Sequence, residues 1–275
     1  MKNFKTLILF VIMAFSIVSF NPAIAQCSNV QVKSVTYYKE LNADLFSSQS
    51  NKSMPAVILI HGGYWSVGDK KELSDFATKL AQNGYLAMTV DYRLLPKYGQ
   101  KEQTTDVTNA IWWLREQSTA LNINPSKIGV VGISAGGYHV AWLATHDEIN
   151  KNGIHSRPDA AVSICGRWDL SEDAEKNMSK DSLKVLESFC PKSDRIIASP
   201  QSAITSSVPP ILIIHGDADS IVPTSQSINA YKKLKNENCK CKLIIVHNQD
   251  HYFPNTPSYF NAMDKSIKFL NTVLK

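Results

Sequence analysis

The feature that most constrains the fold is a run of small and apolar residues, Gly-Val-Val-Gly-Ile-Ser-Ala-Gly-Gly, at 129–137. The apolar, β-branched stretch 128–133 is typical of a strand that is buried on both faces of a sheet. The stretch breaks at Ser134, and a helical pattern follows at once. A strand that turns this sharply into a helix holds the serine in a strained, exposed position, and Gly132 and Gly136 leave room for close packing. The stretch therefore predicts an α/β fold with an exposed serine at the end of a central strand.

The rest of the chain alternates strands and helices. The segments 31–38 and 41–47 alternate in polarity and predict an antiparallel hairpin. Six further apolar runs predict buried strands, at 56–60, 85–90, 128–133, 160–165, 211–214 and 243–246. Helical spacing predicts helices at 69–82, 104–117, 138–145, 222–234 and 259–274. Apolar strands that alternate with helices indicate an α/β fold, with a mostly parallel eight-stranded sheet and helices on both faces.

Residues 1–25 have the features of a secretory signal peptide. Two lysines precede a short apolar run at 7–20, and the Ala-Ile-Ala at 23–25 matches a cleavage site. The apolar run is too short for a comfortable membrane span. We therefore expect an exported protein, periplasmic or secreted, with residues 26–275 as its domain and no stable membrane insertion after cleavage. Lipid anchoring at Cys27 and a buried N-terminal helix are the alternatives.

Charge and cysteine content narrow the function classes. The formal net charge is only +5 and the basic residues are scattered, so we expect no nucleic-acid partner. Export implies an oxidising compartment, and an odd number of cysteines after the signal leaves the disulfide pairing open. Cys239 and Cys241 lie two residues apart, without the further His or Cys pair that a zinc site uses. We expect neither a metal nor a cofactor.

Three side chains that follow strand ends have the chemistry of a catalytic triad. A serine hydroxyl is a weak nucleophile at neutral pH and needs a base, usually histidine, which a carboxylate orients. His251 follows the last predicted strand, and Asp219 lies in the loop after the strand at 211–214. Because ligands bind at the carboxyl ends of parallel strands, we predict that Ser134, Asp219 and His251 meet there. We assign structural or surface roles to the rival residues Asp217, Asp250, His61, His139, His146 and His247.

A second loop supplies candidate donors for a developing negative charge. The His-Gly-Gly at 61–63 follows a predicted strand and should lie opposite Ser134. The backbone N–H groups of Gly63 and Tyr64, with that of Ala135, are the predicted oxyanion hole.

The substrate pocket is harder to place. Residues 166–208 form the only long excursion between predicted strands, and they are either a small lid that walls the acyl or alcohol pocket or a surface insertion. Trp168 in this excursion and Trp65 after the glycine loop are our candidates for pocket residues.

Together these motifs resemble those of the α/β-hydrolase superfamily. Within it the chain is similar to the hormone-sensitive-lipase-like branch, especially to bacterial secreted feruloyl and acetyl esterases. The matching stretches, over about residues 30–275, are His61-Gly62-Gly63 with Trp65, Gly68-Asp69-Lys70, Asp91-Tyr92-Arg93-Leu94, Gly132-Ile133-Ser134-Ala135-Gly136-Gly137, Ala198-Ser199-Pro200, His215-Gly216-Asp217 with Asp219, Val222-Pro223, and His251. The resemblance implies the α/β-hydrolase fold and carries the triad over to Ser134, Asp219 and His251. Tyr64 departs from the third glycine of lipase-like members, and His-Gly-Gly-Tyr-Trp also resembles arylformamidases.

The expected activity is that of a serine carboxylesterase that acts through an acyl-serine intermediate on small or cell-wall acyl esters. An arylformamidase-like amide hydrolase is the alternative. A non-catalytic binding protein on a hydrolase fold is a third interpretation, against which the complete triad argues. The expected partner is a small-molecule or carbohydrate ester, whose acyl and alcohol groups the sequence leaves open, as it does the oligomeric state.

Overall fold

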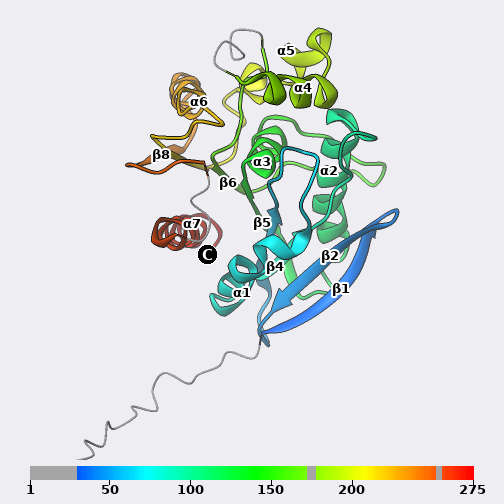
Figure 1. Ribbon diagram of the computed structural model, residues 1–275. Coiled ribbons are helices and arrows are strands. Elements are labelled where there is room, and N and C mark those ends of the chain that lie inside the picture. Colours follow the sequence, from blue (N-terminus) through cyan, green and yellow to red (C-terminus); the bar gives the residue numbers. More distant parts are fainter. Residues whose placement is uncertain (1–29, 172–177, 252–255) are drawn as a thin grey trace, which may run out of the picture.

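The computed structural model describes residues 30–171, 178–251 and 256–275 (Figure 1). The predicted signal peptide and Cys27 lie outside these residues. The strands are β1 (Gln31–Tyr38), β2 (Leu41–Ser47), β3 (Met54–Ile60), β4 (Leu86–Val90), β5 (Ile123–Ile133), β6 (Ala160–Ile164), β7 (Ile211–Gly216) and β8 (Cys241–Val246). They form one sheet in the order β1-β2-β4-β3-β5-β6-β7-β8. β2 pairs antiparallel with β1 and β4, and all other neighbours are parallel, so the predicted sheet is confirmed.

Helices cover both faces of the sheet, as predicted. The α-helices are α1 (Ser74–Gln82), α2 (Gln100–Glu116), α3 (Ala135–Thr145), α4 (Lys180–Phe189), α5 (Arg195–Ala198), α6 (Ser225–Asn236) and α7 (Pro257–Leu274). Short 3-10 helices are η2 (Lys70–Leu73), η4 (Lys192–Asp194) and η5 (Pro200–Ala203). The core cluster on one face contains residues of α2, α3 and α6, and the cluster on the other face contains residues of α1 and α7. Within the described residues, no helix combines the length and the apolar character that a membrane crossing requires.

Strand β3 shows why the apolar runs form a sheet between two helical layers. Ala56, Ile58 and Ile60 belong to the cluster with α2, α3 and α6. Val57 and Leu59 point to the opposite face and belong to the cluster with α1 and α7. All five residues are 0% exposed. Because successive side chains of a strand alternate between faces, a strand covered on both sides must be apolar throughout.

Several element boundaries differ from the predicted ones, most informatively at the starts of α2 and β5. Helix α2 begins at Gln100, four residues before the predicted start, where the Glu102 carboxylate accepts a hydrogen bond from the Gly99 N–H at 3.1 Å. This polar first turn has no apolar periodicity to reveal it. Strand β5 begins at Ile123 rather than at 128, because Ile123 pairs with Met54 beyond an irregularity in the β3–β5 register.

The excursion at 166–208 packs over the start of α3. Its Leu170, Leu186 and Phe189 form a third hydrophobic cluster with Trp65 and Tyr138. Figure 1 shows α4 and α5 of this excursion together at one end of the molecule, beyond α3. The helices of the excursion thus lie where parallel strands end and where the candidate site residues gather.

Candidate active site

Ser134 lies at the sharp turn between β5 and α3. Its backbone has φ 56° and ψ −115°, a strained left-handed conformation for a residue with a side chain. The Ser134 N–H donates to the Ile164 carbonyl oxygen at 2.8 Å, and the Ser134 carbonyl accepts from the Tyr138 N–H at 3.0 Å. A Cβ on Gly136 would collide with the carbonyl oxygen of Ile60, so only glycine lets α3 approach β3 this closely. The turn holds the serine at the carboxyl edge of the sheet.

A continuous chain of hydrogen bonds links Ser134, His251 and Asp219. The Ser134 Oγ lies 2.7 Å from Nε2 of His251, and Nδ1 of His251 lies 2.7 Å from Oδ2 of Asp219. An ionised carboxylate only accepts hydrogen bonds, so Nδ1 carries the ring proton and Nε2 is left to accept the serine proton. His251 and Asp219 are 6% and 8% exposed, which shields the hydrogen bond between them from water. The structure therefore brings the three predicted residues together in hydrogen-bonding order.

Asp219 is held through both of its carboxylate oxygens. Oδ1 accepts hydrogen bonds from the backbone N–H groups of Ile221 and Val222, at 2.9 and 2.8 Å. Nε2 of the buried His215 lies 3.1 Å from Oδ2. Burial alone would raise the pKa of Asp219, but hydrogen bonds from His215 and His251 outweigh burial and hold this pKa below its usual range. The carboxylate is therefore ionised at neutral pH and fixes the His251 ring.

The rival acid and bases are engaged elsewhere or kept neutral. Asp217 pairs with His247 on the surface, with 2.8 Å between Oδ2 and Nδ1. Burial lowers the pKa of His61, and burial together with the neighbouring His61 lowers the pKa of His139 to about 3. Both buried rings are therefore neutral near pH 7, and their lowered pKa values make them weaker bases than an ordinary histidine.

The loop after β3 folds against the serine. His61 is 1% exposed, its Nδ1 lies 2.8 Å from the Gly62 carbonyl oxygen, and its ring stacks on Tyr92 with 4.3 Å between centroids. Gly63 has φ +101°, which glycine adopts without strain, and Tyr64 follows at φ 53°. These successive left-handed residues turn the backbone so that it lines the same cleft as Ser134.

The predicted oxyanion donors line the same hollows as Ser134. Gly63 and Tyr64 line the cleft with Ser134, and Tyr64 and Ala135 line the side cavity with it. Ala135 is the first residue of α3, and the first N–H groups of a helix have no intrahelical acceptor. The helix N-terminus also places partial positive charge at this point. A carbonyl oxygen that becomes negative beside Ser134 would meet backbone donors and a favourable field.

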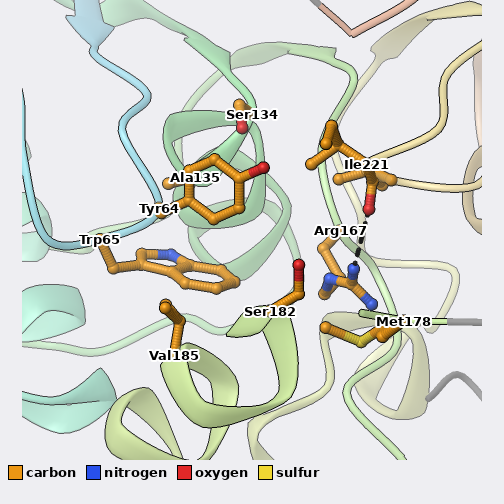
Figure 2. A pocket seen from close by; sticks show the side chains of 10 residues that line it. Tyr64, Trp65, Ser134, Ala135, Arg167, Met178, Ser182, Val185 and Ile221 are labelled. Atoms are coloured by element: carbon orange, nitrogen blue, oxygen red, sulfur yellow. Dashed lines mark hydrogen bonds between the residues drawn. The ribbon is translucent and has the colours of Figure 1, made fainter. Parts of the chain in front are cut away.

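Two hollows meet at Ser134. The open cleft has a volume of about 370 Å³, and its lining includes Gly63, Ser134, His251 and Tyr259. The side cavity is much smaller, with a volume of about 30 Å³, and is shown in Figure 2. Its wall residues include Trp65, Arg167, Met178, Ser182, Val185 and Ile221. An ester with its carbonyl carbon at Ser134 can place its acyl and alcohol halves in different hollows.

The two predicted pocket tryptophans differ in position. Trp65 lines the side cavity and stacks on Phe189 with 4.0 Å between centroids. Trp168 is 0% exposed and packs in the core cluster with α2, α3 and α6, where burial of its large ring is stabilising. The expectation that Trp168 lines the pocket is therefore corrected, and the preceding residue, Arg167, lines it instead. The only sequence signal for Arg167 is its place just after the end of β6.

Cys165 forms a buried cluster with His215 and Asp219 whose atoms are close enough to hold a metal ion. Both ring nitrogens of His215 are engaged, Nδ1 with the Ser227 hydroxyl at 2.6 Å and Nε2 with the Val222 carbonyl oxygen at 2.8 Å. Burial, and then Asp219, raise the pKa of the Cys165 thiol, which keeps it protonated at neutral pH. The donor set therefore does not fit a metal, and the cluster serves to support Asp219.

Comparison with known proteins identifies the family. The model of the BD-FAE family matches residues 43–234, a span that includes Ser134 and Asp219. The chain belongs to the BD-FAE family. This family of α/β-hydrolases agrees with the resemblance drawn from the sequence motifs, which is confirmed.

Curated relatives of the chain include two bacterial esterases. Esterase LipC of Mycobacterium tuberculosis is 28% identical over 198 residues, which cover 67% of this chain and 49% of LipC. The acetylxylan esterase of Xylanibacter ruminicola is 26% identical over 218 residues, which cover 78% of this chain and 44% of that enzyme. The chain thus spans about half the length of the curated relatives it matches.

A solved structure shares the fold. The thermophilic esterase Est2 of Thermogutta terrifontis superposes with a TM-score of 0.76 at 23% identity. The match covers 89% of this chain and 92% of Est2. The α/β-hydrolase fold of the chain rests on this likeness as well as on its own sheet order.

Proposed function

We propose that this chain is a serine carboxylic-ester hydrolase that acts through an acyl-serine intermediate. The observation that carries the proposal is the hydrogen-bonded chain from Ser134 through His251 to Asp219, with 2.7 Å at each step. Membership of the BD-FAE family and the esterase names of the matched relatives support an ester as the scissile bond.

Ser134 is the nucleophile in this proposal. His251 Nε2 takes the hydroxyl proton as Oγ attacks the ester carbonyl carbon, and the ring becomes a cation. Asp219 stabilises this cation through Nδ1 and keeps the ring from rotating. The same Nε2 proton then passes to the departing alcohol, and the acyl group stays on Ser134.

The backbone N–H groups of Gly63, Tyr64 and Ala135 stabilise the oxyanion of the tetrahedral intermediate. Each such donor contributes about 3 kcal/mol to transition-state stabilisation in enzymes of this type. Deacylation repeats these steps with water as the nucleophile, activated by His251 Nε2, and releases the carboxylic acid.

Small or carbohydrate acyl esters are the proposed substrates. The open cleft leaves room for a bulky group, and the narrow side cavity accepts a short one. An acetylxylan esterase among the relatives supports a carbohydrate ester as one such substrate.

Hydrolysis of 4-nitrophenyl acetate tests the activity. The wild type should release 4-nitrophenol with saturation kinetics, and Ser134→Ala should reduce the rate to that of buffer. Ser126→Ala, which removes an exposed hydroxyl far along β5, is the matched control and should keep full activity. Equal turnover by Ser134→Ala and wild type would refute the proposal. Faster turnover of N-formylkynurenine than of any ester would instead favour the arylformamidase alternative.

Export is the second part of the proposal. The positively charged start, the apolar run at 7–20 and the Ala-Ile-Ala at 23–25 support cleavage by a signal peptidase. Expression of the full chain in a Gram-negative host should yield periplasmic protein whose intact mass corresponds to a start at Gln26. A cytoplasmic product that retains residues 1–25 would contradict this assignment.

A further inference from the structure

Arg167 is a buried cation beside the candidate nucleophile. It is 4% exposed and lines the side cavity together with Ser134. Its Nη2 lies 3.5 Å from the Ile221 carbonyl oxygen, at the limit of a hydrogen bond. Its Nη1 is buried and has no hydrogen-bond partner among the described residues. Figure 2 shows this guanidinium in the wall of the cavity, with the Ser182 hydroxyl nearby.

No carboxylate of the described residues forms an ion pair with Arg167, unlike Arg93, Arg115 and Arg195, which each have one. Asp169 and Asp219 are the carboxylates that act electrostatically on Arg167. Asp169 accepts a hydrogen bond from the Ser171 N–H, and Asp219 is engaged by its two histidines.

A buried, unpaired guanidinium is costly for the fold. Burial lowers the pKa of Arg167 to about 10, with Asp169 and then Asp219 acting in the opposite direction, so the side chain is still charged at neutral pH. Buried charges in folded proteins are normally paired, because their loss of hydration is otherwise uncompensated. An unpaired buried charge beside the candidate nucleophile destabilises the fold, and this is expected where a bound ligand supplies the missing partner.

The surrounding walls restrict what that ligand can be. Met178, Val185 and Ile221 are apolar, and the polar side-chain groups near them are the Arg167 guanidinium and the hydroxyls of Ser182 and Tyr64. Arginine has five N–H donors in a planar fork, which matches a carboxylate. The cavity volume of about 30 Å³ admits only a short group.

We propose that Arg167 binds a carboxylate of the substrate, so that the preferred esters carry a short anionic group, of succinyl size or smaller, in the side cavity. This inference rests on the proposed esterase function and names its substrate class. It makes Arg167 a specificity-determining residue, because it contacts the substrate and takes no part in proton transfer.

The test compares pairs of esters that differ only by a methyl group or a carboxylate. On the acyl side the pair is ethyl butyrate and monoethyl succinate. On the alcohol side the pair is propyl acetate and 3-acetoxypropanoate. Acid release is followed by pH-stat titration. In at least one pair the wild type should favour the anionic ester by about 10- to 100-fold in kcat/KM, as expected for a hydrogen-bonded charge.

Variants of Arg167 and Arg115 distinguish a role in binding the substrate carboxylate from a role in stabilising the fold. Arg167→Met should abolish the preference for the anionic ester, because kcat/KM falls much more for the anionic ester than for its neutral partner. It should unfold at an equal or higher temperature, because it removes an unpaired buried charge. Arg167→Lys should keep part of the preference. Arg115→Met is the control: this arginine is ion-paired with Asp159 and bonded to the His155 carbonyl, so its loss should lower the melting temperature and leave the preference unchanged.

Two results would overturn the inference. One is a wild type that favours the neutral ester in both pairs, a measurement that requires no variant to fold. The other is an Arg167→Met variant that loses activity equally on both members of each pair. Either result leaves the Ser134-dependent hydrolysis of 4-nitrophenyl acetate intact, so failure of this inference is distinguishable from failure of the proposed function.

Discussion

Replacing Asp219 with asparagine separates charge from shape at the candidate triad. The amide oxygen of asparagine can still accept from the Ile221 and Val222 N–H groups, which now donate to Oδ1 at 2.9 and 2.8 Å. The amide NH₂ group then takes the place of Oδ2, where it faces the ring nitrogens of His215 and His251. Because an NH₂ group donates, His251 must present a bare Nδ1 and carry its proton on Nε2.

This tautomer cannot accept the Ser134 proton. Loss of the base in this way lowers kcat by about 10⁴-fold in enzymes with this constellation, which corresponds to ~5.5 kcal/mol at 1.36 kcal/mol per tenfold change. The assay is kcat/KM for 4-nitrophenyl acetate, with circular dichroism to verify folding. Asp217→Asn is the matched control, because Asp217 is exposed and pairs with His247. Asp219→Asn with more than a tenth of wild-type activity, or Asp217→Asn as the more damaging change, would refute the reasoning.

The same variant predicts an acid-stability difference. Hydrogen bonds hold the folded pKa of Asp219 below its unfolded value, which is near 4. The ionised carboxylate therefore stabilises the fold above about pH 4, and this stabilisation is lost as pH falls through the lower folded pKa. The wild-type melting temperature should thus fall more steeply below pH 4 than that of Asp219→Asn, and parallel curves would contradict the assignment.

Two further predictions concern the frame of the site. Gly136→Ala should destabilise the protein by about 3 kcal/mol or more in urea unfolding, because its Cβ meets the Ile60 carbonyl oxygen, whereas Gly153→Ala, whose Cβ meets nothing within 4 Å, should cost about 1 kcal/mol through its positive φ. Equal losses of stability in the two variants would show that the turn between β5 and α3 is not tightly packed. Arg93→Met should cost about 3–5 kcal/mol, because it leaves the fully buried Asp106 carboxylate without its partner, and the exposed Lys184→Met should change stability by less than about 0.5 kcal/mol. An effect of Arg93→Met no larger than that of Lys184→Met would contradict the buried pair.

The elements that the sequence predicts well are those with strong periodicity. The hairpin at 31–38 and 41–47 coincides with β1 and β2, and the continuous apolar run before Ser134 becomes the central strand. Each of these segments has a pattern that only one kind of secondary structure can bury. The first turn of α2 is polar and capped by Glu102, so periodicity could not reveal it.

In the candidate site, the triad residues could be predicted from the sequence and the pocket residues could not. Ser134, Asp219 and His251 can be placed from sequence because each follows the carboxyl end of a strand, and such ends converge in a parallel sheet. The pocket could not be placed, because it depends on how the excursion packs. Trp168 and Arg167 are adjacent in sequence, yet one fills the core and the other lines the side cavity.

Covalent labelling of the nucleophile tests the central claim most directly. A fluorophosphonate reacts much faster with a serine that a neighbouring base activates than with an ordinary serine, and the structural relative Est2 has been solved in a form phosphonylated by sarin. Intact-protein mass spectrometry should show one adduct per chain, and peptide mapping should place it on Ser134. The adduct should be absent from Ser134→Ala and much slower to form in Asp219→Asn than in Asp217→Asn. A chain that stays unlabelled, or that is labelled at another residue, would contradict the account.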